Sequence, residues 1–145
     1  MHKQLLERPF IIAIIGKSCS GKTFLAQFLT SFFTSLGLYV HRRISMTTRP
    51  ARINEYEGKD YFFVTETAFN AEKNSGQLIE HTHFRGWQYG VPYSEVRPGY
   101  INIGVFNLEG LKSLQKAKDN YTIIPIYLEE KLNTRLQRSY QREGR

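Results

Sequence analysis

Residues 16–23 have the sequence Gly-Lys-Ser-Cys-Ser-Gly-Lys-Thr, which satisfies the G-x-x-x-x-G-K-[ST] spacing of a phosphate-binding loop. The loop follows a continuous apolar run at residues 10–15, typical of a parallel strand that is buried on both faces. Apolar residues then recur at helical spacing as far as Gly37, a common helix stop, so a helix is predicted over residues 22–36. This order restricts the chain to folds in which a buried parallel strand ends at a phosphate-binding turn.

The rest of the chain alternates between strand and helix patterns, except in one segment. Further strands are predicted at 38–40, 100–106 and 121–128, and further helices at 108–118 and 129–141. This alternation predicts an α/β fold with three layers and a parallel sheet, the P-loop NTPase fold. Residues 45–96 interrupt it with a strand at 61–64 and a helix at 67–73, which indicates an inserted subdomain.

Charge and composition narrow the possible partners. Twenty Lys and Arg against thirteen Asp and Glu give a net charge of +7, which favours an anionic partner such as a nucleotide or a nucleic acid. The basic residues concentrate around predicted phosphate sites and no nucleic-acid-binding module is evident, so we expect no nucleic-acid partner. No apolar run approaches the roughly 18–20 residues that span a bilayer, and one cysteine forms no internal disulfide. We therefore expect a cytoplasmic protein with no membrane partner.

The phosphate loop predicts a site for ATP. Glycines let the main-chain N–H groups turn toward phosphate oxygens, and the helix N-terminus adds partial positive charge. Lys22 would bridge the β- and γ-phosphates, and the Thr23 hydroxyl would be a ligand of Mg²⁺. Cys19 is interpreted as a small loop residue, because no base that could activate it is identifiable. The predicted ATP contacts are Gly16, Ser18, Cys19, Ser20, Gly21, Lys22 and Thr23.

The inserted segment contains a longer pattern. Residues 45–64 read S-M-T-T-R-P-A-R-I-N-E-Y-E-G-K-D-Y-F-F-V, which resembles the guanylate kinase signature S-x-T-T-R-x-x-R-x-x-E-x-x-G-x-x-Y-x-F-V. The match continues through residues 78–80 to the Tyr-Gly pair at 89–90, and with the loop it covers most of residues 10–91. The resemblance implies Mg²⁺-dependent phosphoryl transfer from ATP to GMP. It implies GMP contacts at Ser45, Arg49, Arg52, Glu55, Tyr61, Glu80 and Tyr89.

The chemistry of these side chains fits the roles that the resemblance implies. Arginine forks and tyrosine hydroxyls suit a dianionic phosphate, which Arg49, Arg52, Tyr61 and Tyr89 would hold. Glu55 would orient the arginines or contact the ribose side. Guanine presents N1–H and its 2-amino group side by side, so the Glu80 carboxylate could accept from both while Ser45 donates to O6. Adenine offers a lone pair at the corresponding position and would be rejected.

The C-terminal segment is basic. Arg135, Arg138 and Arg142 resemble the arginines with which guanylate kinases close a lid on the triphosphate, and Arg138 and Arg142 share one helix face. A solvated basic helix is the alternative. With the lid included, the predicted catalytic residues are Lys22, Arg49, Arg138 and Arg142. The predicted organisation is a single domain, 1–145, with core segments 9–44 and 97–130, a monophosphate-binding subdomain 45–96 and a partial lid 131–145.

Two departures from the family pattern leave alternatives open. Val91 and Pro92 follow the Tyr-Gly pair where a small hydroxyl residue is usual, and residues 103–107 contain no carboxylate that could support Mg²⁺. Asn107 either holds a metal-bound water or caps the next helix. The alternatives are a kinase for another nucleoside monophosphate, since Glu80 could also accept from N3–H of a pyrimidine, and a binding module that has lost turnover.

Three further positions receive structural interpretations. His81 and His83 flank one residue of a predicted strand, but no third metal ligand is evident nearby, so a surface or hydrogen-bonded role is favoured over a metal site. Phe84 and Trp87 are interpreted as packing residues of the subdomain and not as residues that stack on a base.

Overall fold

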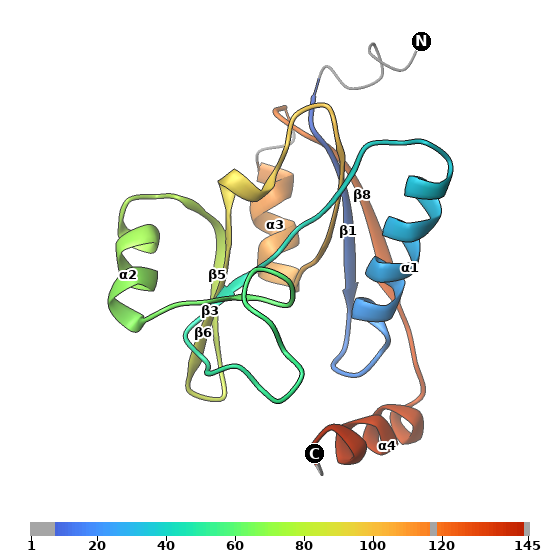
Figure 1. Ribbon diagram of the computed structural model, residues 1–145, viewed down its shortest axis with the longest axis vertical. Coiled ribbons are helices and arrows are strands. Elements are labelled where there is room, and N and C mark those ends of the chain that lie inside the picture. Colours follow the sequence, from blue (N-terminus) through green and yellow to red (C-terminus); the bar gives the residue numbers. More distant parts are fainter. Residues whose placement is uncertain (1–7, 117–118, 144–145) are drawn as a thin grey trace.

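A central parallel sheet with a helix on each face forms the core of the protein. The computed structural model describes residues 8–116 and 119–143 (Figure 1). Its main sheet has the order β2-β7-β1-β8, with all neighbouring pairs parallel. Helices α1 and α3 lie on opposite sides of this sheet, so the predicted fold class is confirmed. These elements are β1 (Phe10–Gly16), α1 (Lys22–Ser35), β2 (Val40–Arg42), β7 (Ile101–Val105), α3 (Leu108–Lys116) and β8 (Thr122–Leu128).

The continuous apolar run of β1 reflects burial on both faces. Ile11 and Ala13 belong to a cluster that includes Leu114 of α3. Ile12 and Ile14, which point the other way, pack with Ala26 of α1. Since successive side chains of a strand alternate between its two faces, a strand between two helices needs apolar residues at every position.

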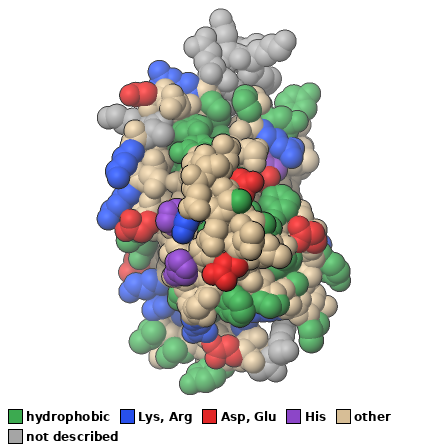
Figure 2. Space-filling view, turned by 90° about the vertical axis from the view of Figure 1, so that its left-hand side faces the viewer, with side chains coloured by type: hydrophobic (Ala, Val, Ile, Leu, Met, Phe, Trp, Pro, Cys, Tyr) green, Lys and Arg blue, Asp and Glu red, His purple; other side chains and the backbone are tan. Residues whose placement is uncertain are grey.

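A second, mixed sheet forms most of the inserted segment. Its strand order is β4-β3-β6-β5, and Figure 2 views the molecule from the side of this subdomain, where acidic, basic and histidine side chains are interspersed. Ile79 and Val91 of this sheet join the cluster around Ile11, so the subdomain shares a hydrophobic core with the main sheet. The elements are β3 (Met46–Thr47), β4 (Phe62–Phe63), α2 (Glu66–Asn74), β5 (Leu78–Phe84), β6 (Trp87–Pro92) and the 3-10 turn η1 (Tyr93–Glu95).

Most predicted elements begin and end within one residue of the observed bounds, and two elements are displaced further for local reasons. The strand predicted at 38–40 begins at Val40, because Gly37 has φ 78° and the Leu38 N–H bonds to the carbonyl of Phe33, which closes α1 first. The helix predicted at 129–141 is α4 (Leu132–Glu143) and begins later than predicted. Its first helical hydrogen bond runs from the Arg135 N–H to the carbonyl of Lys131. The helix predicted at 108–118 is described to Lys116, and its last two residues lie outside the described part.

Helix α1 carries two apolar stripes with different surroundings. Leu25, Leu29 and Phe33 pack against the core. Phe24, Phe28 and Phe32 are 74%, 55% and 47% exposed and form a second stripe at intervals of four residues. Among the helices in residues 8–116 and 119–143, none combines the length and apolar character needed to cross a membrane.

Candidate active site

The phosphate loop connects β1 to α1 through backbone conformations that need glycine. Gly21, immediately before α1, has φ 95°, and Cys19 also lies in the left-handed region with φ 61°. A Cβ atom at Gly16 would lie 2.6 Å from the carbonyl oxygen of Leu128 on β8. The loop therefore curls tightly against the end of the sheet, as the sequence motif predicts.

Lys22 is folded back onto its own loop. Its Nζ donates to the carbonyl oxygens of Gly16 and Lys17, each at 2.8 Å, and burial lowers the pKa of this amine. The Ser20 hydroxyl is buried with no hydrogen-bond partner among the described residues. These groups lie beside a cavity of about 700 Å³, the loop cavity. Its lining residues are Ser18, Cys19, Ser20, Gly21, Lys22, Thr23, Phe24, Leu25, Leu128, Arg138 and Arg142.

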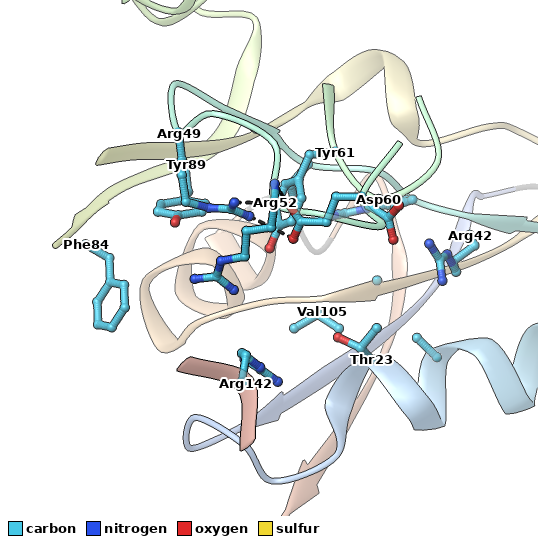
Figure 3. Close-up of a pocket in the computed structure, with 15 residues that line it drawn as sticks. Thr23, Arg42, Arg49, Arg52, Asp60, Tyr61, Phe84, Tyr89, Val105 and Arg142 are labelled. Carbon is cyan, nitrogen blue, oxygen red and sulfur yellow. Dashed lines mark hydrogen bonds and ion pairs between the residues drawn. The ribbon is translucent and has the colours of Figure 1, made fainter. Parts of the chain in front are cut away.

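A second cavity, of about 400 Å³, lies between the subdomain and the core. In Figure 3, Arg49, Arg52 and Tyr61 lie on one side of it, and Thr23 and Arg142 lie across from them. We call it the arginine cavity. Its lining residues are Thr23, Ala26, Arg42, Arg43, Ser45, Arg49, Arg52, Glu55, Asp60, Tyr61, Phe84, Tyr89, Gly104, Val105 and Arg142.

The two cavities share Thr23 and Arg142, so they meet at the start of α1 and near the end of α4. Of the residues predicted to contact ATP, all but Gly16 line the loop cavity, and Gly16 O holds Lys22. Of those predicted to contact GMP, all but Glu80 line the arginine cavity. Residues from distant parts of the chain therefore form two adjoining cavities that meet at Thr23 and Arg142.

Arg49 and Glu55 form a two-point ion pair in the wall of the arginine cavity. Arg49 Nη1 lies 2.9 Å from Glu55 Oε2, and Nη2 lies 3.0 Å from Oε1. Burial opposes both charges, but the paired hydrogen bonds raise the pKa of Arg49 and lower the pKa of Glu55. Glu55 also accepts from the main-chain N–H of Arg52 at 2.8 Å. Of the two roles considered for Glu55, the structure shows the contacts required to orient the arginines.

Aromatic rings support the same wall. The Tyr61 and Tyr89 rings are 6.1 Å apart, and the Arg49 guanidinium lies 5.4 Å from the centre of the Tyr61 ring. Burial, with a contribution from Tyr89, raises the pKa of Tyr61, so its hydroxyl stays neutral near pH 7. The Tyr61 phenol can therefore donate a hydrogen bond to an anion held by the arginines, and Tyr89 places a second phenol hydroxyl in the lining of the same cavity.

Glu80 does not line the arginine cavity. Its side chain packs against α3, where a Cβ atom at Gly110 would collide with Glu80 Oε2. Burial raises the pKa of Glu80 to about 7, and the nearby positive charge of Arg43 opposes this shift. In this conformation Glu80 therefore faces α3, where Gly110 carries no side chain and leaves space, and its contact with the base stays a prediction.

Phe84 is predicted from the sequence to be a packing residue, but the structure places it at a cavity. It is 55% exposed and lines the arginine cavity, so its interpretation as a packing residue is wrong. It ends β5 just before Arg85, whose φ of 51° turns the chain, and the residues at such a tip have few neighbours. Trp87 is 39% exposed and lies outside the two cavities. Other lining residues missed from the sequence are Ala26, Arg42, Arg43, Asp60, Gly104 and Val105.

The two departures from the family pattern have structural explanations. Val91 is 1% exposed and belongs to the core cluster, so an apolar side chain suits its position. Asn107 caps α3, since its Oδ1 accepts from the Gly110 N–H at 2.8 Å. The side-chain oxygen is therefore occupied as a helix cap, which is one of the two roles considered for it.

Protein ligands for a metal are sparse. Among the described residues there is no cluster of three or more His, Cys, Asp or Glu side chains that could hold an ion. His81 and His83 are exposed on one face of β5. Thr23 supplies a hydroxyl at the junction of the two cavities, and Mg²⁺ commonly combines such a ligand with substrate phosphates and waters. This arrangement fits a magnesium ion that arrives with a nucleotide.

The predicted lid arginines differ in their positions. Arg138 Nη1 donates to the Cys19 carbonyl of the phosphate loop at 3.0 Å, and Arg142 lines both cavities. Arg135 lines neither, and its Nε bonds to the Glu130 carbonyl at 3.3 Å. Helix α4 therefore directs two of the three arginines to the cavities.

Comparison with known proteins identifies similar chains. The family model described as guanylate kinase matches residues 7–145. A guanylate kinase of Ehrlichia ruminantium (strain Gardel) is 32% identical over 149 residues, covering 99% of this chain and 69% of that protein. A guanylate kinase of Lawsonia intracellularis is 38% identical over 85 residues, covering 59% and 38%. The crystal structure of guanylate kinase from Anaplasma phagocytophilum superposes with a TM-score of 0.68 at 27% identity, covering 94% of this chain and 69% of that one.

Proposed function

This chain belongs to the guanylate kinase family, and we propose that it transfers the γ-phosphoryl group of ATP to GMP. An oxygen of the GMP phosphate attacks the γ-phosphorus, and the bond from that phosphorus to the bridging oxygen of ADP breaks. The products are ADP and GDP. The observation that carries this proposal is the junction of the loop and arginine cavities at Thr23 and Arg142. Two adjoining anion sites are what transfer between two nucleotides requires.

The loop cavity is assigned to ATP. The loop N–H groups surround the phosphates, and Lys22 exchanges its bonds to the loop carbonyls for bonds to the β- and γ-phosphates. Arg138 and Arg142 approach the same cavity from α4 and offset the charge that develops during transfer. Closing this helix over the loop also excludes water that would otherwise compete with GMP.

The arginine cavity is assigned to GMP. Arg49 is held by Glu55 in a fixed orientation, so it pays little conformational entropy when it binds the phosphate with Arg52. The hydroxyls of Tyr61 and Tyr89 donate to the same phosphate. Ser45 is assigned to O6 of the base, and Glu80 reaches N1–H and the 2-amino group after its side chain turns away from α3. The proposed division of the chain is a core at 9–44 and 97–130, the GMP subdomain 45–96 and a lid at 131–145.

Magnesium would be held by the Thr23 hydroxyl together with nucleotide phosphates and waters. When bound, it supplies charge neutralisation and alignment of the phosphate oxygens. The end of β7, which presents Gly104 and Val105 to the arginine cavity, contributes no carboxylate to this shell.

That missing carboxylate favours one second candidate, a nucleotide-binding module without turnover. A coupled assay for ADP release with GMP, dGMP, AMP, UMP and dTMP, run with a Lys22→Ala control, separates the possibilities. The proposal requires GMP-dependent ADP that disappears in the control. If ADP forms fastest with another monophosphate, that nucleotide and not GMP is the acceptor. If GMP binds but no ADP forms at saturating Mg²⁺, the protein is a binding module without turnover.

A further inference from the structure

Arg43 is a buried cation at the inner wall of the arginine cavity. It follows β2 directly, and its main-chain N–H bonds to Ile103 O of β7 at 2.7 Å. Its side chain crosses β7 at Gly104, where a Cβ atom would lie 3.0 Å from both Cζ and Nε of Arg43. The guanidinium then lies 3.8 Å from the centre of the Phe106 ring. Arg43 as a whole is 6% exposed.

Two of the three nitrogens of this guanidinium lack hydrogen-bond partners in the part of the chain that the structure describes. Nε and Nη1 of Arg43 are buried without a partner among the described residues, and so is Oε2 of Glu80. After burial, the negative charge of Glu80 has the largest effect on the pKa of Arg43, followed by that of Glu95. Glu95 is already engaged, because its Oε2 accepts from His41 Nε2 at 2.9 Å and from the Ile44 N–H at 3.0 Å. Burying unpaired donors and acceptors is costly, so such groups in a native fold require an explanation.

The positions of Arg43 and Glu80 explain why these polar groups have no partners. Arg43 lines the arginine cavity together with Ser45, two residues further along the chain, whereas Glu80 is not among the lining residues and packs against α3. Burial lowers the pKa of Arg43 to about 10, with Glu80 opposing the shift, so the guanidinium remains charged at neutral pH. Gly104 and Gly110 leave the space that these two side chains fill. A ligand edge that accepts from Arg43 and donates to Glu80 would satisfy both.

We propose that Arg43 is a further specificity-determining residue, which donates from its guanidinium to O6 and N7 of the guanine base of the acceptor. The proposal rests on the assignment of this cavity to GMP. An arginine fork matches these two acceptors in geometry, as it does when proteins read guanine in nucleic acids. On the same edge adenine replaces O6 with an amino donor, which would face the donors of Arg43. Pyrimidines lack N7 altogether.

The test uses one analogue for each edge of the base. 7-Deaza-GMP lacks the N7 acceptor, while IMP keeps O6 and N7 but lacks the 2-amino group that Glu80 would bind. kcat/KM is measured for GMP and both analogues by ADP release, and Kd by calorimetry. The variants are Arg43→Met, which keeps an apolar contact over Phe106, Arg43→Lys, which keeps the charge, and Arg42→Ala, which removes the neighbouring arginine of the same cavity.

The wild-type protein is expected to prefer GMP over 7-deaza-GMP by about tenfold. Arg43→Met should reduce this ratio to below about twofold, and Arg43→Lys should reduce it substantially, since an ammonium is not a two-point donor. Both variants should keep the GMP-to-IMP ratio. Arg42→Ala should keep both ratios, whatever its effect on rate. A merely structural role for Arg43 would move all three substrates together and leave the ratios unchanged.

Two results would overturn the proposal: a wild-type protein that does not distinguish 7-deaza-GMP from GMP, or an Arg43 variant that melts like the wild type and keeps the tenfold ratio. Thermal denaturation by circular dichroism establishes folding, and the two Arg43 variants provide independent tests. Failure of the proposed function looks different. In that case no ADP forms with GMP. If the ratio of the Kd values for 7-deaza-GMP and GMP still depends on Arg43, the role of Arg43 in reading the base is supported without turnover. If GMP does not bind at all, both proposals are wrong.

Discussion

The loop cavity and the arginine cavity handle phosphate by different means. The loop cavity is lined mainly by eight consecutive residues, 18–25, whose N–H groups and tight turns come from one local motif. The arginine cavity gathers side chains from residue 23 to residue 142. An anion-binding site made of main-chain groups forms as soon as the loop folds. A site made of side chains depends on the position of every element that contributes one. The first is accordingly insensitive to the side chains at its variable positions, and the second is sensitive at each one.

The largest effect is expected from a substitution in the loop cavity. Lys22→Ala should lower kcat by about 10³-fold with every acceptor, because the amine is the mobile charge among otherwise fixed loop groups. Lys17→Ala is the matched control, since Lys17 is exposed and its main-chain carbonyl, which the substitution keeps, is the group that accepts from Lys22. Equal losses in the two variants would contradict the assignment of Lys22.

A second substitution tests the arginine cavity alone. Arg49→Ala should raise KM for GMP by about 10²-fold, because it removes a phosphate ligand and leaves the Glu55 carboxylate without its partner. KM for ATP should change little. Glu55→Gln, which keeps the shape of the side chain but weakens the grip on Arg49, should give an intermediate loss. A KM for ATP that rises equally would show that the two cavities are not separate sites.

The pH dependence of GMP binding also distinguishes the two cavities, because we expect it to arise from Glu80 in the subdomain and not from the phosphate loop. Glu80 has a pKa of about 7, raised by burial against the opposing charge of Arg43. The protonated acid can accept from one fewer donor, so affinity should increase as pH rises through 7. The ionised fraction changes about tenfold between pH 6 and pH 8, and KM for GMP should fall accordingly.

Glu80→Gln is the control for this profile, because the GMP phosphate itself titrates near pH 6. The variant should lose the change centred at pH 7 while retaining the one at lower pH. A wild-type profile that matches the variant between pH 6.5 and pH 8 would contradict the role of Glu80.

The smallest expected effects concern the lid. Arg138→Ala and Arg142→Ala should each lower kcat/KM by about three- to tenfold, because their side chains remain partly hydrated in this arrangement. Arg142 should affect both nucleotides, and Arg138 chiefly ATP, since it bonds to the Cys19 carbonyl. Arg135→Ala on the same helix lines neither cavity and should have little effect. Steady-state kinetics of the three variants test this order.

Local patterns predicted most of the fold. The apolar run of β1, the loop and the start of α1 could be placed because each depends on neighbours within a few residues. The start of β2 was misplaced because the bonds that close α1 at Phe33 and Leu38 compete with strand pairing. Phe84 was misread for a related reason, since apolar character alone does not reveal that a residue lies at an exposed hairpin tip.

The sequence by itself determined that the chain has a phosphate loop between a buried strand and a helix, and that its inserted segment resembles an acceptor site of guanylate kinases. Both follow from residue types at fixed spacing. Tertiary structure decided that Thr23 and Arg142 join the two cavities, that the Arg43 side chain crosses β7 at Gly104, and that the Glu80 side chain packs against α3 at Gly110. Such contacts join residues far apart in the chain, so they depend on how β2, β5, β7 and α3 pack and not on any local pattern.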